Sequence, residues 1–177
     1  MHRFFLVCFL SLFQFQDGPT ISWDLNNRLE WSDFRGEPKP SNNSVAVTAS
    51  GITFSYSTKK SDTRLIDYHY NIRADFYPNK SWYLKEKADN NILNHERLHF
   101  DITELHARLF RQRIEKTRFT MNIDNQMNRL HEAINKELEA LQKRYDAETR
   151  HSQDLEKQQE WQTKIIEALN KLSRYSS

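Results

Sequence analysis

The stretch Asn94-His95-Glu96-Arg97-Leu98-His99-Phe100-Asp101 decides how the rest of this sequence is interpreted. It holds a His-Glu-x-x-His pattern inside a segment whose apolar residues recur at helical spacing. Residues four apart lie one turn above each other on an α-helix, so the imidazoles of His95 and His99 can reach one metal ion. Glu96 lies about 100° further round, where its carboxylate can take a proton from a metal-bound water. The pattern predicts a zinc site with two histidine ligands and Glu96 as the catalytic base.

The flanking residues favour a buried helix over a chance match on a surface helix. Apolar residues spread around most of the helix: Ile92, Leu93, Leu98, Phe100, Ile102, Leu105, Leu109 and Phe110. A helix that is apolar on most sides is buried. Two histidines and a glutamate on such a helix must be paired or must bind a metal, because an unpartnered buried polar group is costly.

The composition and the N-terminus predict an exported globular protein. The chain has 177 residues, is 37% hydrophobic and carries a net charge of +2, so nothing in it calls for a nucleic-acid partner. His2 and Arg3, followed by an apolar run over 4–15, are typical of a signal peptide, which we place at residues 1–16. The expected location is therefore outside the cytoplasm, with no stable membrane insertion after cleavage. An uncleaved anchor and a buried first strand are the alternatives.

Two strands are expected in the first part of the chain, within residues 17–82. Segments 45–56 and 65–76 are rich in β-branched and aromatic residues, and the polar residues between them make a hairpin plausible. The sequence therefore predicts a small N-terminal antiparallel β-sheet.

The second part, residues 89–173, has helical periodicity throughout. We expect three long helices, over about 89–116, 122–144 and 154–172. Strands followed by helices indicate an α+β fold, with the sheet packed on the three C-terminal helices. Residues 17–177 would form a single zincin-like metallohydrolase domain whose active-site helix is the first of the three.

Two histidines do not complete a catalytic zinc site, which usually has three protein ligands. His106 is excluded as the third ligand because it lies seven residues after His99, about 10 Å along an unbroken helix. Asp101 points to another face of this helix, where it could accept the other N–H of a histidine and fix its tautomer.

The polar segment 145–151 is the best place for the third ligand. It is expected to join the second and third helices, and antiparallel helices bring residues about fifty apart back together. His151 is the first choice. The alternatives are Asp146, Glu148, His131 or no third ligand. If His151 is the ligand, Asp146 or Glu148 could accept its other N–H. Tyr145 could donate a hydrogen bond to a transition-state oxyanion, or could simply pack.

The motifs assembled above resemble those of an uncharacterised family of secreted bacterial proteins, domain of unknown function 922, which is predicted to contain zinc-dependent proteases. The resemblance rests on residues 29–36, Ser81-Trp82, residues 95–102, residues 145–151 and Gln159-x-Trp161. The family pattern has Gly after the late histidine, where this chain has Ser152. The resemblance implies a zinc-dependent protease with an HExxH motif, secreted or periplasmic, in the bacterial cell envelope.

The function expected from the sequence is that of a secreted or periplasmic zinc metallopeptidase. Zinc would polarise the scissile carbonyl of a peptide or protein substrate, and Glu96 would activate the zinc-bound water. The alternative is a non-catalytic envelope binding or structural module. Its structural zinc site should be closed by a fourth protein ligand, whereas a catalytic site keeps an open position. A zinc amidase acting on cell-wall peptides is a third possibility.

Overall fold

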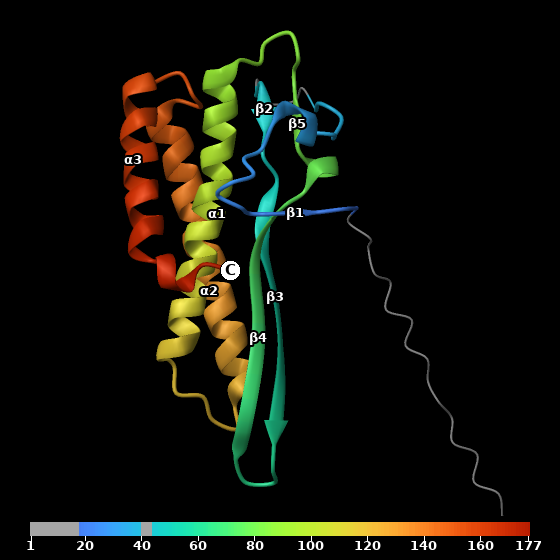
Figure 1. The fold of residues 1–177 in the computed structure, drawn as a ribbon, viewed down its shortest axis with the longest axis vertical. Coiled ribbons are helices and arrows are strands. Elements are labelled where there is room, and N and C mark those ends of the chain that lie inside the picture. The colour runs from blue at the N-terminus through green and yellow to red at the C-terminus, as the bar shows by residue number, and fades with distance from the viewer. Residues whose placement is uncertain (1–17, 40–43) are drawn as a thin grey trace, which may run out of the picture.

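The structure is a computed structural model that describes residues 18–39 and 44–177. The signal peptide predicted at residues 1–16 lies outside the described residues. Within them the α+β prediction is confirmed, because a small set of antiparallel strands precedes three long helices (Figure 1). No helix in the described ranges is both long enough and apolar enough to cross a lipid bilayer.

A long hairpin forms most of the main sheet. It consists of β3 (Ser50–Lys60) and β4 (Leu65–Phe76), which pair in antiparallel register from Ser50 opposite Phe76 to the turn. The short strand β1 (Ile21–Ser22) pairs with the other edge of β4, so the strand order is β1-β4-β3. β4 coincides with the strand expected over 65–76.

The strand expected over 45–56 is divided between two sheets. β2 (Ala46–Val47) pairs with β5 (Trp82–Tyr83), and β3 begins only at Ser50. The chain changes partner at Ala49, whose N–H donates to Ser81 Oγ at 2.9 Å. Composition alone does not reveal this change, because residues on both sides of it have similar strand propensity.

The helical part consists of α1 (Asn90–Lys116), α2 (Ile123–Thr149) and α3 (Leu155–Lys171). Short 3₁₀ turns lie at Trp31–Asp33 (η1), Pro78–Lys80 (η3) and Ser173–Tyr175 (η4). α1 begins where expected, and its N-cap is Asp89, whose carboxylate accepts from the Ile92 N–H at 2.8 Å. That carboxylate satisfies one of the N–H groups that the first turn leaves unpaired.

α1 is the central element of the fold. In Figure 1 it lies between α3 and the hairpin, with α2 packed beside it. One core cluster joins α1 to the sheet and to α2, through Phe76, Phe100, Phe110, Ile114 and Met127. A second cluster joins α1 to the other two helices, through Leu98, Ile102, Tyr145, Trp161 and Ile165. Each buried apolar side chain of this size contributes about 1.5–3 kcal/mol, so α1 is held rigidly on several sides.

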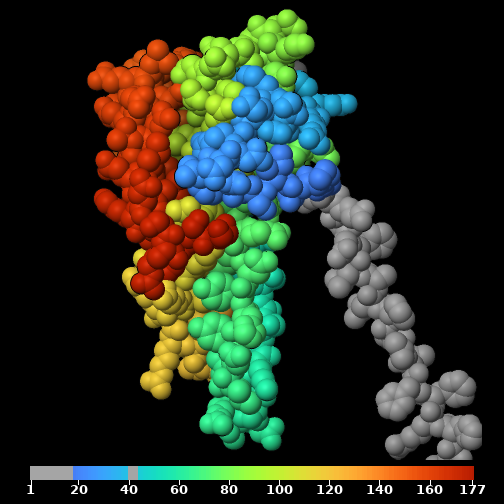
Figure 2. Space-filling view, viewed as in Figure 1, coloured from blue at the N-terminus to red at the C-terminus, as the bar shows by residue number. Residues whose placement is uncertain are grey.

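The N-terminal segment 18–39 crosses the molecule and covers part of α1 (blue in Figure 2). Asp101 of α1 holds this segment in place, and only 4% of the Asp101 surface is exposed. The Asp101 carboxylate accepts from Trp23 Nε1 at 2.7 Å and from both terminal nitrogens of Arg28 at 2.6 Å. A bidentate Arg–carboxylate pair fixes orientation as well as charge, so this contact sets where the segment crosses the helix.

Candidate metal centre

α1 carries the two histidines of the motif on one face. His95 is 3% exposed and His99 is partly buried, and their ring centroids are 4.8 Å apart. The Nε2 atoms of the two rings lie 3.2 Å apart. The i, i+4 spacing therefore produces the convergence that the sequence predicted.

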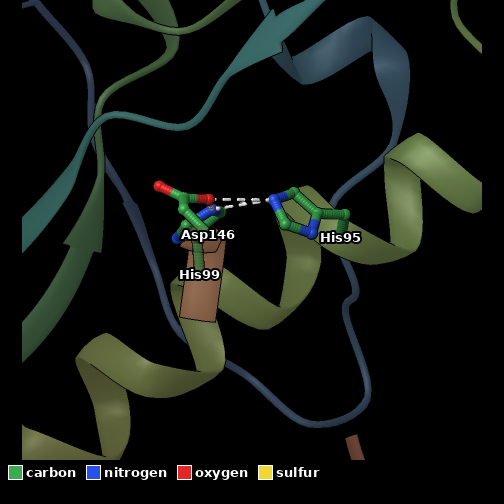
Figure 3. Close-up of side chains that lie close together, drawn as sticks. All are labelled: His95, His99 and Asp146. Atoms are coloured by element: carbon green, nitrogen blue, oxygen red, sulfur yellow. Dashed lines mark hydrogen bonds and ion pairs between the residues drawn. The ribbon is translucent and has the colours of Figure 1, made fainter. Parts of the chain in front are cut away.

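α2 supplies the third donor. It runs antiparallel to α1, since Glu137 of α2 pairs with Arg113 near the end of α1 while Asp146 reaches back to His95 and His99. Asp146 Oδ1 lies 3.1 Å from His95 Nε2 and 2.9 Å from His99 Nε2. Figure 3 shows the carboxylate and the two imidazoles pointing at one another. Within the described ranges, His95, His99 and Asp146 are the group whose ligand atoms lie close enough to hold one metal ion.

Glu96 lies beside this group without a partner for one of its oxygens. Its side chain is buried, with 5% of the residue exposed, and Oε2 accepts no hydrogen bond from any described residue. A buried carboxylate oxygen with no donor is costly, so its position calls for a functional explanation.

The three donors and Glu96 line a cavity of about 660 Å³. Its lining includes the segment 44–48, which contains β2, and residues of α2 from Asn135 to Asp146. The volume falls in the range of small-ligand and substrate pockets. The group of donors therefore opens onto space that a small molecule can enter.

A family model for bacterial proteins of unknown function (DUF922) matches residues 24–152, which is more than half of the chain. The chain belongs to the DUF922 family. The matched range includes both histidines, Glu96 and Asp146, and ends before α3. No curated protein and no solved structure matches the chain.

Two carboxylates, those of Glu96 and Asp146, act on the histidines of this DUF922 site. Burial opposes protonation of His99, but the hydrogen bond to Asp146 and the charges of Glu96 and Asp146 outweigh it and raise the pKa of His99. Burial likewise opposes ionisation of Asp146, but its hydrogen bonds with His95 and His99 hold the pKa of that carboxyl well below its usual range. Both directions indicate a site that favours a positive charge at its centre.

His151, the first choice from sequence, lies outside the group of three. Its side chain is 75% exposed and its Nδ1 is 3.6 Å from Asp146 Oδ1. α2 continues to Thr149, five residues beyond its expected end, so Asp146 lies on the inner face of a helix and not in a connecting turn. His151 then falls in the turn itself, with φ of 53°, between Arg150 and Ser152, which also have positive φ. The geometry favours Asp146 over His151 as third ligand, the reverse of the order inferred from sequence.

The remaining candidates have other contacts. Glu148 accepts from Arg144 Nε at 2.7 Å and from Trp161 Nε1 at 2.8 Å, on a different side of α2 from Asp146. Asp101 binds Trp23 and Arg28, as described above, and makes no hydrogen bond with a site histidine.

Tyr145 and His131 are packing residues in the described structure. The Tyr145 ring stacks on His95 with centroids 4.5 Å apart, and its hydroxyl lies 3.4 Å from the His95 backbone oxygen. Tyr145 is fully buried and does not line the cavity. His131 packs against Phe54 and Phe110.

Two glutamines that sequence analysis did not single out contact the outer nitrogens of the two imidazoles. Gln158 of α3 places Oε1 3.2 Å from His95 Nδ1, and Gln142 of α2 makes a short contact with His99 Nδ1. Gln142 precedes Asp146 by one helical turn, so it could have been found once Asp146 was chosen. Nothing in the local sequence marks Gln158.

Proposed function

We propose that this DUF922 protein is a secreted or periplasmic zinc-dependent hydrolase of the peptidase class, with a zincin-like centre. His95, His99 and Asp146 would hold the ion, and Glu96 would be the general base. The observation that carries the proposal is the unpartnered Oε2 of Glu96, buried beside three converging donors at the wall of a cavity.

The donor set fits zinc. Two imidazoles and a carboxylate are a ligand set of catalytic zinc sites, and tetrahedral bonds of 2.0–2.2 Å place neighbouring donors roughly 3.3–3.6 Å apart. The observed separations of 2.9, 3.1 and 3.2 Å are somewhat shorter, so the three donors need to move apart by only a few tenths of an ångström to hold the ion. The two carboxylates of Glu96 and Asp146 also match the charge of a divalent cation. Three protein donors beside a cavity favour a catalytic site over a structural one, which would be closed by a fourth.

A zinc ion bound there would lower the pKa of a water molecule and polarise a carbonyl group. Glu96 then accepts the proton of the attacking water at its carboxylate and delivers it to the leaving amine. The rigid packing of α1 holds that carboxylate at a fixed place relative to His95 and His99, and such positioning lowers the entropic part of the barrier.

An extended peptide is the substrate that the cavity wall suits best. The Leu84 N–H donates to the Val45 carbonyl at 2.8 Å, so this pair is hydrogen-bonded and the next pair, Ala46 with Tyr83, is not. The N–H and C=O of Ala46 therefore point away from β5, and Figure 1 shows α1 on that side of β2. A peptide strand added at this edge would run past the metal centre by pairing its backbone with β2.

The test is the variant Glu96→Gln, with Glu132→Gln on the exposed face of α2 as the matched control. Glu96→Gln should bind zinc with a stoichiometry of one and lose roughly 10²–10⁴-fold in peptide hydrolysis, while the control stays at the wild-type rate. Both are measured on zinc-loaded protein with a pooled peptide library and mass spectrometry. Full activity of Glu96→Gln would rule out the mechanism. Zinc binding by the wild type without any hydrolysis would point to the non-catalytic module.

A further inference from the structure

Each imidazole of the candidate centre has one nitrogen that faces the candidate metal position and another that faces a glutamine. Their Nε2 atoms point to Asp146 and to each other, whereas Nδ1 of His95 faces Gln158 and Nδ1 of His99 faces Gln142. Which nitrogen carries the proton in a neutral histidine depends on whether the glutamine presents its oxygen or its nitrogen.

The orientation of the Gln158 amide is determined by what lies on its other side. Its Nε2 is 3.1 Å from the backbone oxygen of Asn91 and 2.6 Å from Asn91 Oδ1. Asn91 is oriented in turn, because its Nδ2 donates to the Ser152 carbonyl at 2.8 Å. A backbone carbonyl can only accept, so reversing either amide would set oxygen against oxygen. Gln158 must present Oε1 to His95.

The Gln142 amide is oriented in the same way by the backbone of α1. Its Nε2 donates to the His99 carbonyl oxygen at 2.9 Å, which leaves Oε1 facing the ring of the same residue. The two glutamines come from different helices, yet both pair a backbone carbonyl of α1 with a site histidine.

We propose that Gln142 and Gln158 are positioning residues that hold His99 and His95 as the Nδ1–H tautomer and so direct both Nε2 lone pairs at the metal. An amide oxygen only accepts, so each Nδ1–H donates to its glutamine, and with a cation in place of a proton on the other side the neutral ring has its lone pair on Nε2. Two such lone pairs and the Asp146 oxygen lie within 3.2 Å of one another, an arrangement that a cation satisfies. This inference rests on the proposed function for the identity of the cation.

The contacts also explain why an amide, and not a carboxylate, supports each ring. Many metal-bound histidines donate their second N–H to a carboxylate. Here a carboxylate at position 142 or 158 would accept from Nδ1–H on one side, but its other oxygen would face a backbone carbonyl. Only a group that accepts on one side and donates on the other fits both neighbours.

The test has two independent measurements. The first is zinc affinity, by chelator competition, for Gln142→Met, Gln158→Met and Gln158→Glu, with Gln159→Met on the exposed face of α3 as control. Each of the three should bind zinc about 10–100-fold more weakly than wild type, and the control should match wild type. Gln158→Glu should show no rescue over Gln158→Met.

The second measurement reads the tautomers directly, by ¹⁵N NMR of the histidine rings in zinc-loaded protein, because in zinc-free protein the Asp146 carboxylate also accepts and competes for the proton at Nε2. The wild type should show Nδ1–H in both rings. Gln158→Met should shift the Nδ1 signal of His95 and leave that of His99 unchanged, so the unaffected ring reports an intact fold.

Nε2–H rings in the wild-type protein, or unchanged zinc affinity in all three variants, would overturn the proposal. If a variant fails to fold, the wild-type tautomers still decide the matter. A wild-type protein that binds no zinc would refute the metallohydrolase, whereas a wild-type protein that binds zinc no more tightly than the three variants would refute the positioning role, so the two failures are distinguishable.

Discussion

Replacing Asp146 and His151 by alanine, one at a time, separates the two candidate third ligands. Asp146 Oδ1 lies 2.9 and 3.1 Å from the two imidazole nitrogens, and its loss removes one of three donors and one of two negative charges. Four-ligand structural zinc sites bind with about 10–16 kcal/mol, or about 3 kcal/mol per ligand. Asp146→Ala should therefore weaken zinc binding on the order of 10²-fold.

His151→Ala should change zinc affinity little. The His151 side chain is 75% exposed and its nearest contact with the site, Nδ1 to Asp146 Oδ1, is 3.6 Å. An exposed ion pair of this kind contributes about 0–1 kcal/mol, which corresponds to less than about fivefold in affinity. The zinc affinities of the two variants should therefore differ by more than about tenfold.

The assay is competition for zinc against a chelator of known affinity at constant pH. Glu148→Ala is the matched control, because it also removes a carboxylate from the last turns of α2 but one that binds Arg144 and Trp161. Thermal unfolding of each zinc-free variant checks that the fold is retained. Equal losses in Asp146→Ala and His151→Ala, or wild-type affinity in Asp146→Ala, would refute the assignment of the third ligand.

Three further predictions concern the residues around the site. Tyr145→Phe keeps the ring stacked on His95 and should lower the free energy of unfolding in urea by at most about 1 kcal/mol. The rate of peptide hydrolysis should be unchanged, and a large loss of turnover would assign the hydroxyl a catalytic role. Asp101→Asn disrupts the bidentate pair with Arg28, which is partly exposed, and should lower the free energy of unfolding by about 2 kcal/mol. Its zinc affinity, measured by calorimetry, should equal that of the wild type. The pKa of His99 is raised in the folded state, so its contribution to the stability of the zinc-free protein is complete below the ordinary value of 6.5 and is lost as pH rises through the folded-state value. Denaturant unfolding of zinc-free protein should therefore show stability falling above about pH 6.5, and His99→Gln should flatten that dependence.

The elements with strong periodicity could be predicted from the sequence. α1 was expected over 89–116 and β4 over 65–76, because long buried elements leave a clear pattern of apolar residues. The end of α2 was misplaced by five residues. Tyr145 and Thr149 continue the buried face of that helix, but they stand among charged residues that resemble a loop. Packing of the Tyr145 side chain against α1 and α3 keeps this polar stretch helical.

The site could be predicted only where its parts are close in the chain. His95, Glu96 and His99 are one motif, so their convergence follows from helix geometry. The choice between Asp146 and His151 depended on the last turn of α2, and an error of one turn reversed it. The contact of Gln158 depends on how α3 packs against the start of α1, which no local pattern encodes.

The separation of the donors along the chain has a consequence for how the protein withstands unfolding. Two of them lie on α1, and the third follows about fifty residues later on α2. The sequence has a single cysteine, so it cannot form an internal disulfide. An ion shared by His99 and Asp146 would act as a removable cross-link across that loop, and loop-closure entropy for such a length is roughly 4 kcal/mol. The stability of the protein would then depend on the metal supply of its surroundings, and a metal-starved molecule would unfold and be degraded by proteases before a metal-loaded one.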